Sequence, residues 1–112
     1  MAFKSDILRG HTDTIILKIL AEGDNYGYEI AKNIIEASEN LIDIKDATIY
    51  TAFRRMEHEG YIATYWGDGV NGARRRYYSI TPKGKMFYEE KVKEWSVINT
   101  VLNKLILGKE NK

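Results

Sequence analysis

The sequence predicts a mainly α-helical chain with one small β-hairpin and a long last helix, and three observations lead to this fold class. Apolar residues recur at helical spacing in four segments, which begin near residues 6, 26, 46 and 82. Two β-rich runs, 61–66 and 74–80, flank a loop with three glycines and an Asn-Gly pair. The length of 112 residues suits one domain with an appended helix.

The first two helices are expected over residues 6–21 and 26–38. In the first, apolar side chains fall roughly on one face, although Gly10 weakens the first turn. Residues 22–25, Glu-Gly-Asp-Asn, form a turn cluster that separates the two helices. The stretch 41–45 alternates apolar and polar side chains, which indicates a short extended segment.

The third helix is expected over residues 46–59. Ile49, Phe53 and Met56 recur at i, i+4 and i+7, so they face the core. The opposite side carries polar and aromatic groups: Thr48, Tyr50, Thr51, Arg54 and Arg55. Gly60 follows the last turn, where helices commonly end in the left-handed conformation.

The hairpin is expected to have strands at 61–66 and 74–80, with 67–73 as its loop. Thr81 and Pro82 are typical of an N-cap and a first helical residue, and they begin a last helix that runs to about Leu107. At the α-helical rise this helix is roughly 39 Å long. Its early apolar residues are expected to cover the core: Met86, Phe87 and Val92.

Composition excludes several classes of protein. The chain has no cysteine, which rules out disulfides, thiolate metal sites and cysteine nucleophiles and fits a reducing compartment. The two histidines, His11 and His58, argue against a multi-histidine metal centre. No apolar run approaches 18 residues, and the N-terminus lacks a signal-peptide apolar block. We therefore expect a cytoplasmic protein with no cofactor, no metal and no membrane contact.

The formal net charge of +1 hides an uneven distribution. Residues 70–88 carry five basic and no acidic side chains, whereas residues 21–69 carry four basic and ten acidic ones. The basic block is interleaved with Tyr77 and Tyr78, which is typical of an element that faces phosphate. Taken alone, so short a block is also compatible with a solvated charge run.

Three helices followed by a two-stranded hairpin and a further helix predict a winged helix-turn-helix, in which the third helix enters the DNA major groove and the hairpin contacts the adjacent backbone. The candidate DNA-binding residues are Thr48, Tyr50, Thr51, Arg54, Arg74 and Arg75. For each one, the alternative is an exposed side chain with no specific contact. The domain division is 1–81 for DNA binding and 82–112 for dimerisation.

Dimerisation is expected from the last helix. Trp95, Ile98, Leu102 and Leu105 step by three, four and three residues, which makes an a/d seam. An apolar helix that extends beyond a small core needs a partner surface, and a second copy of the chain is the most economical partner. We expect the last helix to pack against the last and first helices of the partner.

Three segments of the chain carry a family likeness: NYGYEIAKNI (25–34), ATIYTAFRRMEHEGYI (47–62) and GARRRYYSITPKG (72–84). In these segments the chain resembles the PadR-type transcriptional regulators, and the resemblance covers about residues 7–107. The single C-terminal helix resembles the small subfamily. The segments GDNYGYEI, ATIYT, YWGD and EWS are most similar to LmrR-like multidrug-responsive repressors.

This resemblance implies a homodimer on a pseudo-palindromic DNA operator, which represses its own gene and a neighbouring transporter or detoxification gene. Thr48, Tyr50, Thr51 and Arg54 would be the recognition-helix contacts, with Arg74 and Arg75 on the wing. The chain departs from the family at Lys45-Asp46-Ala47, where Ser, Pro and Gly are common, and at Thr51, where Pro is frequent. The groove contacts can therefore differ in detail from those of the family, and the operator sequence does not follow from the resemblance.

The LmrR-like resemblance also implies a ligand. In those relatives, the tryptophan at the position of Trp95 lines a pore at the dimer interface, where two indoles sandwich flat aromatic compounds. Asn99 shares its helical face, while Thr14 and Lys18 would border the pore with Asp13 near. For Trp95 alone, a packed interface tryptophan is the alternative.

An enzyme is not expected. His58 and its neighbours Glu57 and Glu59 diverge around a helix, and no P-loop, nucleophile elbow or metal-ligand spacing is present. Two alternatives to the ligand-controlled repressor stay open: a winged-helix module for protein interaction, and a DNA-binding regulator without a small-molecule ligand. The sequence also leaves activation open as an alternative to repression.

Overall fold

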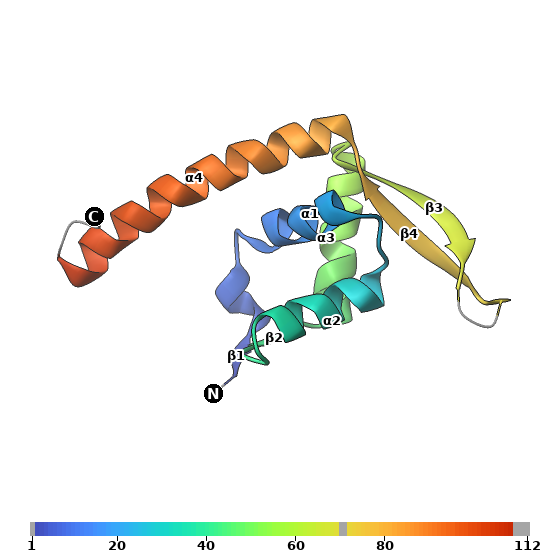
Figure 1. Ribbon diagram of the computed structural model, residues 1–112. Coiled ribbons are helices and arrows are strands. Elements are labelled where there is room, and N and C mark those ends of the chain that lie inside the picture. Colours follow the sequence, from blue (N-terminus) through green and yellow to red (C-terminus); the bar gives the residue numbers. More distant parts are fainter. Residues whose placement is uncertain (1, 70–71, 109–112) are drawn as a thin grey trace.

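A computed structural model describes residues 2–69 and 72–108 and has the expected winged helix-turn-helix with a long last helix (Figure 1). The elements in chain order are β1 (Phe3–Lys4), the 3-10 helix η1 (Ser5–Leu8), α1 (Thr12–Glu22), α2 (Gly27–Ala37), β2 (Ile42–Asp43), α3 (Asp46–His58), β3 (Ile62–Asp68), β4 (Arg74–Ile80) and α4 (Pro82–Leu107). None of the described helices is long and apolar enough to cross a membrane.

The start of the chain differs from the single helix expected over 6–21. Gly10 adopts a φ of +85°, so the helix breaks there into η1 and α1. This left-handed conformation favours glycine and cannot continue a right-handed helix. Ahead of η1, β1 pairs in parallel with β2, which ties the N-terminal segment to the stretch that precedes α3.

The core lies between α1, α2, α3 and the base of the hairpin. The amphipathic pattern of α3 is confirmed, because Ile49, Phe53 and Met56 are at most 1% exposed. The ring of Phe53 stacks on Tyr78 of β4, with centroids 3.8 Å apart. This contact fixes the back of α3 to the hairpin and leaves the opposite face of α3 open.

The hairpin is antiparallel and pairs Ile62 with Ile80 at its base and Asp68 with Arg74 near its tip. Strand β3 runs two residues beyond the predicted end at Trp66, because Gly67 and Asp68 continue the ladder. Val70 and Asn71, at the tip of the expected loop, lie outside the described residues.

Helix α4 begins and ends as the sequence predicts. The Thr81 hydroxyl accepts a hydrogen bond from the Gly84 backbone N–H at 3.0 Å, and Gly108 ends the helix with a φ of +70°. Phe87 covers the core as expected and stacks on Tyr61 at 4.1 Å. Met86 and Val92 are 66% and 43% exposed, so the expectation for these two residues is wrong. Beyond α1, the C-terminal part of α4 extends away from the three-helix core (Figure 1).

Candidate functional site

The open face of α3 is the first part of the candidate site. Ile49, Ala52, Phe53 and Met56 bury one side of the helix. This leaves an exposed stripe at i, i+4, i+7 and i+11 that consists of Ala47, Thr51, Arg54 and His58. Thr48 and Arg55 flank this stripe on the side of α1, where both line one cavity with residues of that helix.

Within the stripe, the side chains of Thr51 and Arg54 are linked. The Thr51 hydroxyl donates to the Ala47 carbonyl oxygen at 2.8 Å and accepts a bond from the Arg54 guanidinium at 3.4 Å. Among residues 2–69 and 72–108, none of the ion pairs involves Arg54. The guanidinium of Arg54 therefore keeps a net positive charge on the exposed face of α3.

Tyr50 lies on the α2 side of α3. Its ring packs edge-on against Phe53, with centroids 5.7 Å apart, and covers Gly27 at the start of α2. A methyl group at Gly27 would lie 2.7 Å from the Tyr50 hydroxyl oxygen. Gly27 thus provides the room that lets Tyr50 bridge the two helices while 42% of the tyrosine stays exposed.

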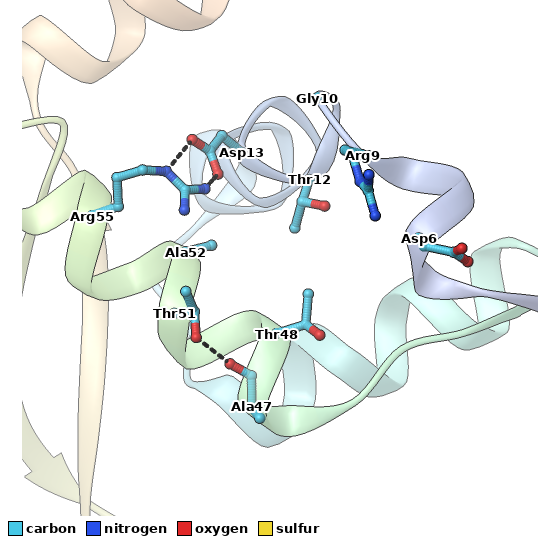
Figure 2. Close-up of a pocket in the computed structure, with 10 residues that line it drawn as sticks. All are labelled: Asp6, Arg9, Gly10, Thr12, Asp13, Ala47, Thr48, Thr51, Ala52 and Arg55. Atoms are coloured by element: carbon cyan, nitrogen blue, oxygen red, sulfur yellow. Dashed lines mark hydrogen bonds and ion pairs between the residues drawn. The ribbon is translucent and has the colours of Figure 1, made fainter.

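A cavity of about 690 Å³ lies between the beginning of α1 and α3 (Figure 2). Its walls combine basic, acidic, hydroxyl and small side chains from η1, α1 and α3: Asp6, Arg9, Gly10, Thr12, Asp13, Ala47, Thr48, Thr51, Ala52 and Arg55. Arg55 is held there by Asp13, through Nε to Oδ2 at 3.2 Å and a second, shorter bond from Nη2 to Oδ1. Asp13 consequently faces α3, and the structure does not place it in the cavity of Trp95.

The arginines of the wing are divided between the two faces of the hairpin. Arg74 lies over the Trp66 ring at 5.6 Å, whereas Arg75 lies over Tyr26, just before α2, at 4.4 Å. Consecutive residues of a strand point to opposite faces, so these two guanidinium groups start from different sides of the hairpin.

Arg76, which the sequence analysis did not single out as a contact, joins the hairpin to α3. Its guanidinium lies 3.6 Å from the Glu57 carboxylate and donates to the Thr64 hydroxyl at 2.9 Å. The spacing of alternate strand residues would have placed Arg76 on the same face as Tyr78, which packs on α3. The side chain of Arg76 thus connects the wing and α3 rather than standing alone at the tip.

The hairpin is also fixed to the turn between α1 and α2. Asn25 and Tyr78 exchange two backbone hydrogen bonds, at 3.1 and 2.8 Å. The Tyr65 hydroxyl donates to the Asp24 carboxylate at 2.7 Å, and this hydrogen bond raises the pKa of Tyr65 above 10.0. Burial raises the pKa of Tyr78, which anchors the same strand. The wing therefore has a set orientation relative to α3.

A second cavity, of about 450 Å³, lies between α1 and α4. Trp95 is 45% exposed at this cavity, and its indole packs edge-on against His11, with centroids 5.1 Å apart. Two charged side chains, Lys91 and Glu94, also line the cavity. The rest of the wall consists of apolar or small residues: Ile7, Leu8, Gly10, Thr14, Ile15, Val92 and Ile98.

Of the residues expected around a ligand pore, Trp95 and Thr14 meet in this cavity. Lys18 instead lines a neighbouring cavity that also touches Thr14, and it pairs with Glu22 at 3.1 Å. Asn99 is exposed on α4 and lines neither cavity. Sequence reasoning did not select His11 for this cavity, although it is one of only two histidines and directly precedes α1.

The residues of the expected dimer seam are exposed in the single chain. Ile98, Leu102 and Leu105 are 43%, 41% and 75% exposed, and Val101 and Ile106 widen the same apolar surface. Among the described residues, no group of three or more His, Cys, Asp or Glu side chains is arranged to hold a metal ion.

Comparison with known proteins identifies the family of this chain. The model of the transcriptional regulator PadR-like family matches residues 16–90, which is more than half of the chain. The chain belongs to the PadR-like family of transcriptional regulators. The matched part of this PadR-family chain runs from α1 through the hairpin into the first turns of α4, so it includes α3 and stops before Trp95.

Solved structures of similar proteins support this family assignment. A transcriptional regulator from Clostridium thermocellum is 50% identical with a TM-score of 0.82, over 89% of this chain and 97% of that chain. A PadR family transcription regulator from Clostridium difficile is 42% identical with a TM-score of 0.74, over 84% and 96% of the two chains. Bacillus subtilis PadR, solved in complex with operator DNA, shares the fold at 22% identity and a TM-score of 0.66, over 76% of this chain and 48% of that chain.

Proposed function

We propose that this PadR-family chain is a homodimeric transcriptional repressor that binds a pseudo-palindromic DNA operator through α3 and the hairpin. The observation that carries the proposal is the exposed stripe of α3, where Thr51 and Arg54 are linked to each other at 3.4 Å opposite a fully packed face. A helix that buries one side and exposes hydroxyl and guanidinium donors on the other is suited to the major groove.

DNA as the partner is supported from two directions. Bacillus subtilis PadR, which shares the fold, was solved with operator DNA. Residues 70–88, which include β4 and the start of α4, carry five basic and no acidic side chains, while residues 21–69 carry an excess of acidic groups. A basic segment beside an acidic one favours a polyanion that approaches from the basic side.

We assign Arg74 and Arg75 to phosphate contacts, with different geometries. Arg74 is backed by the exposed Trp66 ring and belongs to the outer part of the hairpin. Arg75 is backed by Tyr26 at 4.4 Å, so its contact would lie nearer to α2. Stacking on a ring orients a guanidinium while leaving its edge free to donate to phosphate oxygens.

Dimerisation through α4 is supported by the apolar surface that the single chain leaves exposed. Leu105 and Ile106 are each 75% exposed beyond the core, at the end of a helix whose first turns are packed. A second copy related by a two-fold axis would cover this surface and place two α3 helices on two operator half-sites.

We further propose that flat aromatic or hydrophobic compounds bind at Trp95 and modulate operator binding, as in the LmrR-like relatives that this chain resembles. A half-exposed indole at an apolar cavity of about 450 Å³ supports a ligand of that class, because cavities of such size hold small molecules. Insertion of a ligand between two symmetry-related indoles would change the angle of the α4 helices and hence the spacing of the two α3 helices.

The test of DNA binding is an electrophoretic mobility shift with DNA from upstream of the protein's own gene, repeated at several salt concentrations. We expect a specific complex whose affinity falls steeply with salt, because phosphate contacts release counterions. Lys93→Ala, which removes one positive charge from α4 away from α3 and the hairpin, is the control and should leave the complex intact. Equal weak binding to every duplex, without salt dependence, would contradict the repressor and favour the protein-interaction module.

The regulated gene and the sign of regulation are tested together. We propose that the operator is an inverted repeat beside a transporter or detoxification gene. A reporter placed behind that region should be silenced by the chain and released by an aromatic effector. Higher reporter output in the presence of the chain would identify an activator instead. Reporter output that aromatic compounds do not change would contradict the proposed small-molecule effector.

A further inference from the structure

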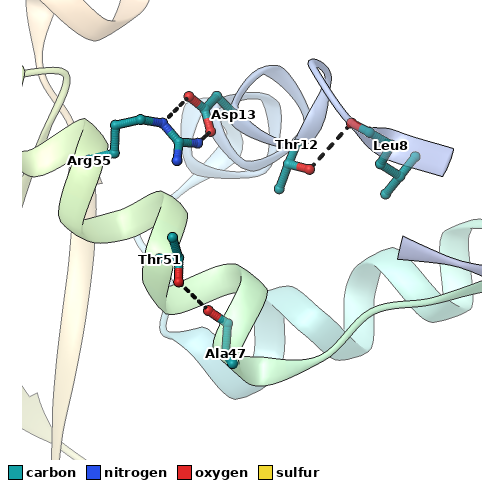
Figure 3. A network of polar contacts seen from close by, with 6 residues as sticks. All are labelled: Leu8, Thr12, Asp13, Ala47, Thr51 and Arg55. Carbon is teal, nitrogen blue, oxygen red and sulfur yellow. Dashed lines mark hydrogen bonds and ion pairs between the residues drawn. The ribbon is translucent and has the colours of Figure 1, made fainter. Parts of the chain in front are cut away.

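A contact between α1 and α3 sets one arginine of the α3 surface apart from its neighbour. The Arg55 guanidinium binds Asp13 through two N–H groups, although the two residues are 42 positions apart in sequence (Figure 3). Both oxygens of the Asp13 carboxylate accept these bonds, so the pair has the bidentate geometry that fixes the guanidinium plane.

The pairing leaves donors of Arg55 unused. A guanidinium carries five N–H groups, and Asp13 accepts from two nitrogens, which leaves the Nη1 edge for another acceptor. Figure 2 shows this group beside the cavity between α1 and α3, where Thr48 and Thr51 form part of the same wall. Those two residues belong to the proposed DNA contacts, so Arg55 borders the DNA surface from a fixed position.

Arg54 provides the internal comparison, since it carries the same side chain one residue away. Its guanidinium donates to the Thr51 hydroxyl at 3.4 Å, and among the described residues none of the ion pairs compensates its charge. Asp13 neutralises the charge of Arg55 and restricts the rotation of the Arg55 side chain. The two arginines therefore differ in what they can offer to DNA: Arg54 a movable positive charge, Arg55 an oriented set of donors.

We infer that Asp13 is a positioning residue for DNA recognition: it holds Arg55 toward α1, prevents that guanidinium from swinging onto the phosphate backbone, and so raises the discrimination between operator and other DNA. This inference rests on the proposed DNA-binding function. Phosphate contacts carry no sequence information, whereas the Nη1 edge of Arg55, which Asp13 orients and leaves free, can donate to a base edge. An arginine held away from phosphate contributes to specificity at the expense of non-specific affinity.

The pair contributes little to folding, which makes it testable. The side chains of Arg55 and Asp13 are 52% and 26% exposed, and an ion pair that water reaches from one partner in this way adds little stability. Asp13→Asn keeps the shape of the side chain and removes its charge, so the variant should melt at nearly the wild-type temperature. A change in DNA recognition without a change in melting separates positioning from a structural role.

The experiment compares the operator fragment with a scrambled duplex of equal length and composition, over a range of salt concentrations. Asp13→Asn should bind the scrambled duplex more tightly and steepen its salt slope by about 0.9, because Arg55 becomes one more phosphate contact. The ratio of operator to scrambled affinity should fall by roughly 3- to 10-fold, the cost of one oriented base contact.

Double variants isolate the route through Arg55. In the Arg55→Ala background, Asp13→Asn should leave the affinity ratio unchanged, because the general charge effect acts equally on both duplexes. In the Arg54→Ala background, the matched control, Asp13→Asn should still lower the ratio. An unchanged ratio in the single variant, or an equal fall in the Arg55→Ala background, would overturn the inference while wild-type operator binding stands. Loss of operator preference in the wild type itself would instead overturn the proposed function and this inference with it.

Discussion

The imidazole of His11 lies edge-on against the indole of Trp95, with the two ring centroids 5.1 Å apart and the ring planes at 76°. His11 directly precedes α1 and Trp95 lies in the middle of α4, so this contact joins the two helices at the wall of one cavity. The indole is supported by this contact while 45% of the residue stays exposed. Such a ring is oriented and accessible, which are the two conditions for stacking with a planar compound.

The first prediction concerns this indole. Trp95→Ala should abolish saturable binding of a planar dye, because the stacking surface is removed, while operator affinity changes less than about twofold. The measurement is a titration that follows the fluorescence of the dye itself, because Trp66 also emits and the Trp95→Ala variant has lost the indole at the site. Trp66→Phe alone is the control and should bind the dye normally. Retained dye affinity in the Trp95→Ala variant would place the ligand elsewhere.

The second prediction concerns the wing. Replacing Arg74 and Arg75 together by alanine should weaken binding to all duplexes and lower the salt slope by up to about 1.8, the value for two phosphate contacts. Each single variant should lower the salt slope by about half of this value, because the two side chains lie over different rings, Trp66 and Tyr26. Salt-dependent mobility shifts measure this. A loss confined to the operator, with normal binding to other duplexes, would mean base contacts instead.

The third prediction concerns the α4 seam. Leu102→Glu should shift the chain from dimer to monomer, because it would bury a carboxylate in an apolar interface. Sedimentation equilibrium or light scattering measures the mass directly. Lys93→Glu, which also introduces an acidic group on α4, is the control and should remain a dimer. A monomeric wild type, or a dimeric Leu102→Glu variant, would place the interface on another surface.

The fourth prediction concerns the start of α4, where Gly84 is buried against the backbone of Tyr61, just before β3. A Cβ at this position would overlap the Tyr61 carbonyl oxygen and lie 2.9 Å from the Ile80 side chain. Gly84→Ala should lower the free energy of unfolding by about 2 kcal/mol or more, since overpacking against backbone has no easy relaxation. Chemical denaturation provides the value. Lys85→Ala, in the same turn and exposed, should be neutral to within about 0.5 kcal/mol. Equal stability of both variants would show that α4 can shift.

The fifth prediction concerns pH. The Tyr65 hydroxyl donates to Asp24, so the pKa of Tyr65 lies above 10.0 in the folded chain. This contact stabilises the fold fully at pH values below the ordinary tyrosine pKa, and its contribution is lost as pH rises through the raised pKa. An NMR titration of labelled tyrosine rings checks the shift. Asp24→Asn should return the pKa of Tyr65 toward 10.0. An unchanged titration would show that Asp24 is not the cause of the raised pKa.

Local chemistry made much of the fold predictable. The bounds of α4 follow from residues at its two ends, because Thr81 and Pro82 begin a helix and Gly108 adopts the left-handed conformation that ends it. The core face of α3 follows from spacing alone. The break at Gly10 was not predicted, because apolar periodicity continues across it and glycine is compatible with both outcomes.

The sequence by itself determined the winged helix-turn-helix, the exposed polar stripe of α3 and the apolar surface of α4. The tertiary structure decided which surfaces meet. Asp13 and Thr14 are neighbours on α1, yet Asp13 faces α3 and pairs with Arg55, while Thr14 faces α4 and lines the cavity of Trp95. The reason is geometric: adjacent helical residues point about 100° apart, and periodicity states which residues share a face but not which helix lies against it.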